Sequence, residues 1–123
     1  MEEYQVFIDF FPLNPKVAEA ETKIKELNDK MARKEFDNAR IYSKMEYYTA
    51  AFKYYDSVME IYHDTQYAPL ALYSKINLLI ERDRESEALI ESHKFLQKYP
   101  QHENYSDVEK IKNSLESKLT VNP

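Results

Sequence analysis

The chain contains no glycine among its 123 residues. Glycine lets a backbone turn through positive φ or approach a phosphate closely, so its absence excludes the P-loop, the dinucleotide-binding fingerprint and the EF-hand loop. Only five prolines interrupt the sequence. The segments between them show the three- and four-residue spacing of apolar side chains that is typical of helices. The sequence therefore predicts an all-α protein.

Composition narrows the classes of function further. Cysteine is absent, which excludes disulfides, thiolate nucleophiles and thiolate zinc sites. The formal net charge of −5 would repel a polyphosphate, so we expect no nucleic-acid partner. No window approaches the ~18 consecutive apolar residues that a membrane-spanning helix needs. We therefore expect one soluble domain with no cofactor.

Apolar periodicity predicts six helices, over about residues 1–11, 15–44, 46–62, 67–82, 84–99 and 106–119. Asp83 is expected to cap the fifth helix, and Ser106 with Glu109 has capping-box spacing at the start of the sixth. The apolar seam of the second helix consists of Val17, Ala20, Ile24, Leu27 and Met31. The third helix is expected to bury a wide stripe made of Tyr47, Ala50, Ala51, Tyr54, Tyr55, Val58, Ile61 and Tyr62.

Three helix ends are similar to one another, which indicates an internal repeat. They run from Phe7 to Pro12, from Val58 to His63 and from Phe95 to Pro100. Their aromatic residues Phe11, Tyr62 and Tyr99 are 51 and 37 residues apart, and the second spacing is close to the 34-residue tetratricopeptide repeat. The 37-residue shift also superposes Ala51 on Ala88, where a small side chain lets two helices of a hairpin approach.

This pattern predicts a tetratricopeptide-like right-handed stack of antiparallel helices, with one long connecting helix. The first copy of the repeated helix end already lies in the second helix of a hairpin. A lone half repeat would leave an apolar face unmatched, so we expect the chain to be a C-terminal fragment that starts within a repeat.

Four stretches of the chain resemble the C-terminal half of the BamD family, the tetratricopeptide lipoproteins of the bacterial outer-membrane β-barrel assembly machine. They are Tyr4 to Ile8 leading into Phe11 and Pro12, Leu27 to Glu35 with Ala39 and Tyr42, Tyr47 to Phe52, and Tyr62 to Thr65 leading to Ala71 and Leu72. The second stretch is the most specific, because it resembles the long helix with which this family joins one repeat to the next. The resemblance covers the chain from about Tyr4 to Pro100.

The resemblance implies a location on the periplasmic face of the outer membrane, where a lipid anchor absent from this chain would hold the full-length protein. It implies a non-enzymatic scaffold that docks on the periplasmic domain of the barrel-forming subunit and on accessory lipoproteins. The alternative is a generic tetratricopeptide module that binds extended peptides or belongs to another periplasmic complex.

Candidate partner-binding residues follow from the repeat alignment, because the first helix of each tetratricopeptide hairpin lines the concave surface. They are Arg33, Phe36, Arg40 and Lys44 from one repeat and Tyr73, Asn77, Ile80 and Glu81 from the next, with Tyr48 as an exposed aromatic residue off the stripe of its helix. The three cations share one helix face and favour an acidic partner surface. A solvated helix face is the bland alternative, and the helix ends near Asp83 or Gln101 are the next candidates.

No residue pattern indicates catalysis or a metal site. His63, His93 and His102 have no second ligand at helical spacing, and no serine has a histidine at a spacing that suggests activation. A catalytic triad is recognised by geometry and not by sequence order, so an enzyme stays as the third class. Phe36 and Tyr73 stand where repeats that clamp a C-terminal carboxylate carry lysine, which argues against that mode of peptide binding.

Overall fold

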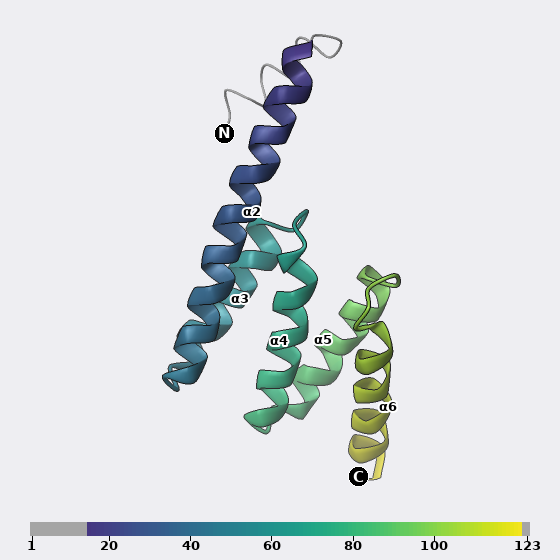
Figure 1. Ribbon diagram of the computed structural model, residues 1–123. Coiled ribbons are helices and arrows are strands. Elements are labelled where there is room, and N and C mark those ends of the chain that lie inside the picture. The colour runs from purple at the N-terminus through teal and green to yellow at the C-terminus, as the bar shows by residue number, and fades with distance from the viewer. Residues whose placement is uncertain (1–14, 122–123) are drawn as a thin grey trace.

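The computed structural model describes residues 15–121, which form five helices (Figure 1). Their bounds are α2 Pro15–Lys44, α3 Tyr48–Ile61, α4 Tyr67–Glu81, α5 Glu85–Lys98 and α6 Tyr105–Val121. This described part contains no strand, so the prediction of an all-α fold is confirmed. The helix predicted over residues 1–11, with the first of the three similar helix ends, lies outside the described residues.

The helices form two layers of an antiparallel stack. In Figure 1, α2, α4 and α6 lie in one layer, and α3 and α5 lie in the other. Each helix contacts the next one along the chain, and α4 also contacts α2. Successive hairpins that pack on their neighbours are the arrangement of a tetratricopeptide stack, so the predicted fold class is confirmed.

The α2–α3 turn ends its helix with a Schellman motif. The N–H of Tyr47 donates to the carbonyl of Tyr42 at 2.9 Å, and the N–H of Glu46 donates to the carbonyl of Ser43 at 3.0 Å. Glu46 has a φ of 64°, in the left-handed region that glycine usually occupies at this position. Because the chain has no glycine, an acidic residue adopts this conformation.

The α4–α5 turn repeats these hydrogen bonds 37 residues later. The N–H of Arg84 donates to the carbonyl of Leu79 at 2.9 Å, and the N–H of Asp83 donates to the carbonyl of Ile80 at 3.1 Å. Asp83 has a φ of 60°, matching Glu46. The loops after α3 and α5 match at the same shift, with bonds from Thr65 to Tyr62 and from His102 to Tyr99. The backbone therefore confirms the 37-residue repeat.

The small residues of the repeat lie in buried clusters to which three helices contribute. Ala51 and Ala88 are both fully buried. Ala51 belongs to a core cluster shared by α2, α3 and α4, which also contains Ala39, Tyr55, Val58, Ala71 and Leu78. Ala88 belongs to a cluster shared by α4, α5 and α6, with Leu79 and Leu115. A third cluster around Phe95 and Ile76 lies between these helices.

The predicted stripe of α3 is wrong at its two ends. Tyr47 is 57% exposed and Ile61 is 64% exposed, whereas Tyr48, predicted to be exposed, is half-buried against the Ala51 cluster. The reason is that α3 begins at Tyr48, so Tyr47 belongs to the turn and the helical period does not extend to it. The buried face is centred on Ala51, Tyr55 and Val58.

Two predicted helix caps are also wrong. Asp83 is the left-handed residue that ends α4, and Arg84 precedes α5 without a side-chain capping bond. α6 begins at Tyr105, where the N–H of Val108 donates to the carbonyl of Asn104 at 3.0 Å, so Ser106 lies inside the first turn. At the α4–α5 turn the backbone geometry that ends α4 takes the place of the predicted cap, and α6 begins one residue before the predicted start at Ser106.

The seam of α2 is buried at its start and open further along. Val17 and Ala20 are buried, whereas Leu27 and Met31 are 41% and 50% exposed.

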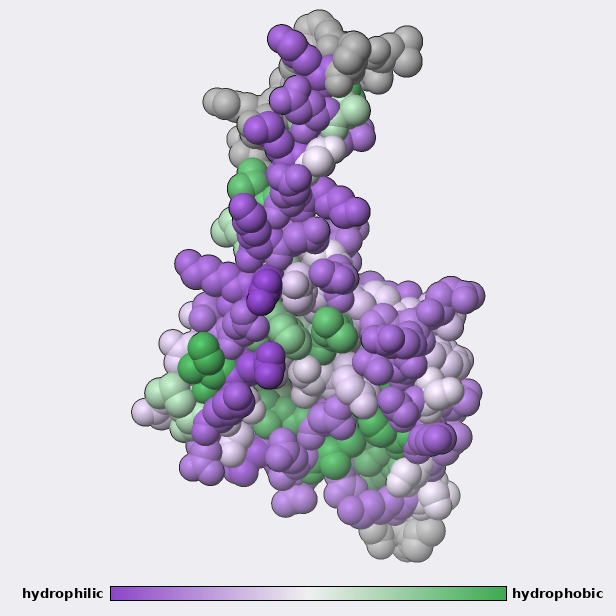
Figure 2. Space-filling model, in the orientation of Figure 1, coloured by the Kyte–Doolittle hydropathy of each residue, from purple (hydrophilic) through white to green (hydrophobic). Residues whose placement is uncertain are grey.

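α3 has 14 residues, about 21 Å of helix, and covers only the second half of the 30-residue α2 (Figure 1). The first half projects beyond the body and is mainly hydrophilic on the face shown in Figure 2, where hydrophobic residues gather over the body.

Candidate functional site

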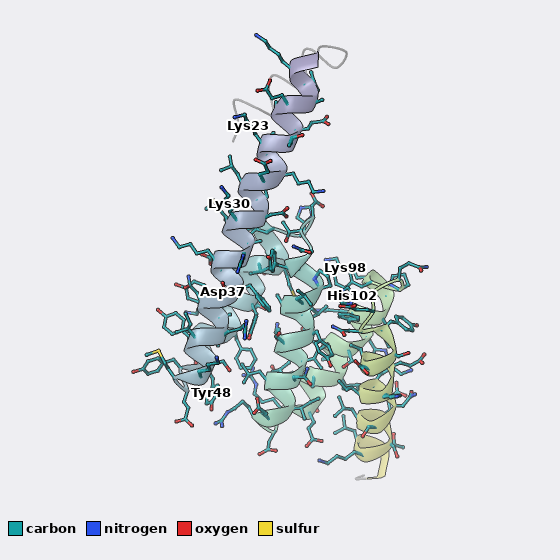
Figure 3. The ribbon with its side chains drawn as sticks, viewed as in Figure 1. Lys23, Lys30, Asp37, Tyr48, Lys98 and His102 are labelled. Atoms are coloured by element: carbon teal, nitrogen blue, oxygen red, sulfur yellow. The ribbon has the colours of Figure 1, made fainter. Side chains whose placement is uncertain are left out.

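The predicted cations of α2 are exposed and share one helix face by their spacing, and Asp37, which Figure 3 labels, lies among them. Arg33 Nε lies 3.8 Å from Asp37 Oδ2, and Arg40 Nη1 lies 4.0 Å from Asp37 Oδ1. The guanidinium of Arg40 lies 6.0 Å from the centre of the Phe36 ring. Lys44 is exposed at the end of the helix. Asp37 therefore offsets part of the positive charge that the sequence predicts for this face.

The predicted residues of α4 have a different character. Tyr73 is half-buried, with its ring 6.5 Å from that of Phe95. Asn77 is exposed, and its Nδ2 donates to the carbonyl of Tyr73 at 3.2 Å. Ile80 packs against the core, while Glu81 is exposed. The exposed part of this row is polar and acidic, in contrast to the basic row on α2.

The two rows lie on neighbouring helices of one layer, and Phe36 connects them. Its ring lies 5.9 Å from Tyr67 of α4 and 6.0 Å from Tyr55 of α3. Phe36 is therefore mainly a packing residue. Tyr48 does not join this surface, because it lies near the α2–α3 turn in the other layer (Figure 3).

Tyr48 instead lines an open groove of about 780 Å³ between the two hairpin turns, which we name the turn groove. Its aromatic lining comes from Tyr42, Tyr47, Tyr48 and Phe52. Its charged lining comes from Glu46, Lys53, Arg82 and Arg84. Three cations against one acid make the groove locally positive on a chain of net charge −5.

Two arginines of the α4–α5 turn stack on aromatic rings of α3. The guanidinium of Arg82 lies 4.2 Å from the centre of the Tyr48 ring, and that of Arg84 lies 4.8 Å from the centre of the Phe52 ring. Both distances are within the range of cation–π attraction. These contacts join the second hairpin to the first helix turn of α3 and fix the wall of the groove.

The two arginines of the groove differ in whether a carboxylate of the described chain binds them. Arg84 Nη2 donates to Glu87 Oε2 at 2.6 Å and Nε donates to Oε1 at 3.1 Å, and this hydrogen bonding holds the pKa of Glu87 below its usual value. No carboxylate of residues 15–121 lies within ion-pair distance of Arg82. α3 begins without a side-chain cap, so the positive end of its dipole adds to the charge of the groove.

The sequence did not lead us to predict Arg82, Arg84 and Phe52 as members of a site, and only the nearby helix end at Asp83 was a second choice. One signal was present, since the 37-residue shift places residues 45–47 and 82–84 in equivalent turns of adjacent hairpins. The four-residue spacing of Tyr48 and Phe52, which places both rings on one helix face, was a second signal.

The described residues offer little support for a metal site or for a membrane-spanning helix. Between residues 15 and 121 no three side chains of His, Asp or Glu converge in a way that would hold a metal ion. His63 Nδ1 pairs with Asp64 at 2.8 Å and His93 Nε2 with Glu116 at 3.3 Å, both on the surface. None of the described helices combines the length and apolar character that crossing a membrane requires.

Comparison with known protein families shows which family the chain matches. A family model described as "YfiO: Outer membrane lipoprotein" matches residues 1–86, a span that includes both predicted rows and all residues of the turn groove. A search of curated proteins finds no match to the chain. The chain belongs to the YfiO family of outer membrane lipoproteins.

Proposed function

We propose that the chain is a non-enzymatic protein–protein interaction scaffold of the outer-membrane β-barrel assembly machinery, corresponding to the C-terminal half of BamD. In this proposal a single tetratricopeptide-like domain works on the periplasmic side of the outer membrane. It docks on the periplasmic domain of the barrel-forming subunit and on accessory lipoproteins. Membership of a family of outer membrane lipoproteins is the observation that carries the proposal.

The form of the molecule supports a scaffold role. Stacked hairpins of α2 to α6 present an extended surface, and each hairpin turn is held by the same backbone hydrogen bonds. Arg33 and Arg40 are exposed on the α2 face, with side-chain exposures of 71% and 54%. Exposed charges of this kind steer association and contribute little to folding.

Titration of the chain with the purified periplasmic domain of the barrel-forming subunit tests the proposal. We expect binding that weakens with salt, because charge pairs between exposed groups are screened. Arg40→Glu should weaken binding about tenfold, ~1.4 kcal/mol, while the melting temperature stays within error. Lys23→Glu, on the projecting part of α2, is the matched control and should bind as the wild type does.

One result would contradict the proposed function, and a second would contradict only the proposed contact surface. If the periplasmic domain does not bind the wild-type chain at low ionic strength, the scaffold function is wrong. If Arg40→Glu and the wild type bind equally, the scaffold function stands and the contact surface lies elsewhere, most simply at the turn groove.

A generic peptide-binding module is the second candidate, and the turn groove favours it. The groove is open and combines four aromatic rings with three cations, a lining that suits an extended segment. A module of this kind would bind peptides of one chemistry from unrelated proteins, whereas the scaffold would bind the barrel subunit's periplasmic domain more tightly than such peptides. A titration in which an extended peptide competes with that domain distinguishes the two functions.

A further inference from the structure

We infer that the turn groove binds a carboxylate side chain of a protein partner and that Arg82 is the residue that holds it. The partner segment carries an aspartate or glutamate next to apolar residues, which rest on the aromatic lining. This inference rests on the proposed function only in that the partner is a protein. It adds a site that lies outside the predicted α2 and α4 rows.

The two arginines of the α4–α5 turn provide the main argument. Both stack on a ring of α3, at 4.2 Å for Arg82 and 4.8 Å for Arg84. Arg84 already holds a carboxylate through two hydrogen bonds, at 2.6 and 3.1 Å, and that carboxylate is Glu87 of the same chain. Arg82 has the same stacking and lacks such a partner among residues 15–121. Arg82 can therefore bind a carboxylate of another protein.

Stacking leaves Arg82 able to bind. The aromatic ring contacts the flat face of a guanidinium, whereas its N–H donors point outward in the plane and match the two oxygens of a carboxylate. Arg82 is exposed, and Tyr48 beneath it is half-buried against the core cluster of α2, α3 and α4. The ring thus fixes the guanidinium before a partner arrives, which lowers the entropic cost of binding.

The remaining lining selects the neighbours of the carboxylate. Tyr47 is 57% exposed at the edge of the groove and offers an apolar surface to the partner. Lys53 adds a second cation, while Glu46 is the acid that opposes the partner's charge. The net charge of −5 opposes a polyphosphate, which carries many negative charges, more strongly than a peptide segment with a single carboxylate, so such a segment is the occupant that fits.

The groove is preformed by the fold. Its rims are the α2–α3 and α4–α5 turns, which share one hydrogen-bond pattern with Glu46 and Asp83 at the left-handed position. Rims that are held by backbone bonds do not need to rearrange when a ligand enters. Binding should therefore change the surroundings of the lining residues without changing the helix content.

Two synthetic peptides test the inference with the ¹⁵N-labelled chain. One has a central glutamate between two leucines in a serine spacer, and the other replaces that glutamate with glutamine. We expect the glutamate peptide to shift the amide resonances of the groove lining, and the glutamine peptide to bind about fivefold more weakly or not at all.

Four variants locate the effect. Arg82→Gln should lower the affinity for the glutamate peptide about fivefold. The affinity of Arg82→Lys should lie between those of Arg82→Gln and the wild type, because lysine keeps the charge and loses the planar fork of the guanidinium. Glu46→Gln should tighten binding about twofold by removing the opposing acid. Lys23→Gln removes an exposed cation of the projecting part of α2, outside the groove, and should have no effect. All four substitutions are at exposed positions, and unchanged melting temperatures confirm folding.

The inference is overturned if Arg82→Gln binds the glutamate peptide as tightly as the wild type, if both peptides bind equally, or if millimolar glutamate peptide shifts no groove resonance. The barrel subunit's periplasmic domain is titrated in parallel. Binding of that domain without peptide binding would leave the scaffold function standing and remove the groove site. Peptide binding through Arg82 without binding of that domain would keep the groove site and remove the proposed identity of the partner.

Discussion

At the scale of single residues, the two hairpin turns place an acidic residue in a conformation that favours glycine. Glu46 and Asp83 have φ of 64° and 60°. A Cβ in this region contacts the backbone, at a cost of about 1–2 kcal/mol per residue. Both turns are nevertheless closed by the same pair of backbone hydrogen bonds.

Replacing one of these residues with glycine should stabilise the protein. We expect Glu46→Gly to raise the free energy of unfolding by about 0.5–1 kcal/mol, because relief of the Cβ contact exceeds the entropy that glycine adds to the unfolded chain. The urea midpoint at unchanged slope measures this. Met45→Gly, one residue earlier and outside the left-handed region, should instead lower the midpoint. A lower midpoint for Glu46→Gly would contradict the strain argument.

Tyr55 should make stability depend on pH in the alkaline range. Burial raises the pKa of Tyr55 above 10.0, and a hydrogen bond with Ser74 lowers it by less. A folded pKa above the unfolded value means that the contribution is complete below about pH 10 and is lost as pH rises through the folded pKa. Melting temperatures from about pH 9 to pH 11 should therefore fall.

Tyr55→Phe should reduce this alkaline loss, with the remainder due to residues such as Tyr99, whose pKa burial also raises. Tyr47→Phe is the control, because Tyr47 is exposed and should leave the pH dependence unchanged. Identical alkaline slopes for Tyr55→Phe and the wild type would show that Tyr55 does not cause the effect.

At the scale of elements, the repeat places one fully buried alanine in each second helix of a hairpin. Ala51 of α3 lies against α2 and α4, and Ala88 of α5 lies against α4 and α6. A side chain without atoms beyond Cβ lets three helices meet at these points. The positions are equivalent, so one substitution should have similar effects at both.

We expect Ala51→Leu and Ala88→Leu each to lower the free energy of unfolding by ~1–3 kcal/mol through overpacking. Urea unfolding measures the change. Ala18→Leu, at an exposed position of α2, is the matched control and should change stability by less than about 0.5 kcal/mol. Unchanged midpoints for both buried sites would mean that the helices can separate to admit a larger side chain.

At the scale of the whole molecule, one lysine connects the two hairpins. Lys75 of α4 has its Nζ 2.7 Å from Asp56 Oδ1 of α3 and 3.7 Å from Glu91 Oε1 of α5. Lys75 and Glu91 expose only 16% and 13% of their side chains. Water therefore screens this network less than the surface ion pairs of the molecule. The ammonium group of Lys75 links α4 to both α3 and α5.

Lys75→Met should lower the free energy of unfolding by about 1–2 kcal/mol, because it leaves Glu91 largely buried with less positive charge nearby. Adding Glu91→Gln to this variant should recover part of the loss. Lys94→Met removes the exposed cation that lies 3.3 Å from the same acid and should cost less than about 0.5 kcal/mol. Equal losses for the two lysine variants would show that burial is not the cause.

The helices and their repeat were predictable from sequence because their signals are local. Apolar spacing reports the helical period directly, and the helix ends at Tyr62 and Tyr99 lie 37 residues apart in sequence and in equivalent loops of the structure. The cap at Asp83 was wrongly predicted because Asp83 belongs to the hydrogen-bonded turn that ends α4. The cap at Ser106 was wrong by one residue, since α6 begins at Tyr105.

The sequence by itself determined the all-α class, because the helical period depends on neighbours within one or two turns. It also determined the hairpin repeat and its small residues, because similar segments recur 37 residues apart. The ion pairs of Asp37 with Arg33 and Arg40 are at i,i+4 and i,i+3 spacing on one helix, so the sequence already contains them. Only the tertiary structure decided that Tyr48 packs inward and that Arg82, 34 residues away, stacks on its ring. The physical reason is that a groove between two turns is formed by residues far apart in the chain, and periodicity along one helix carries no information about its neighbour.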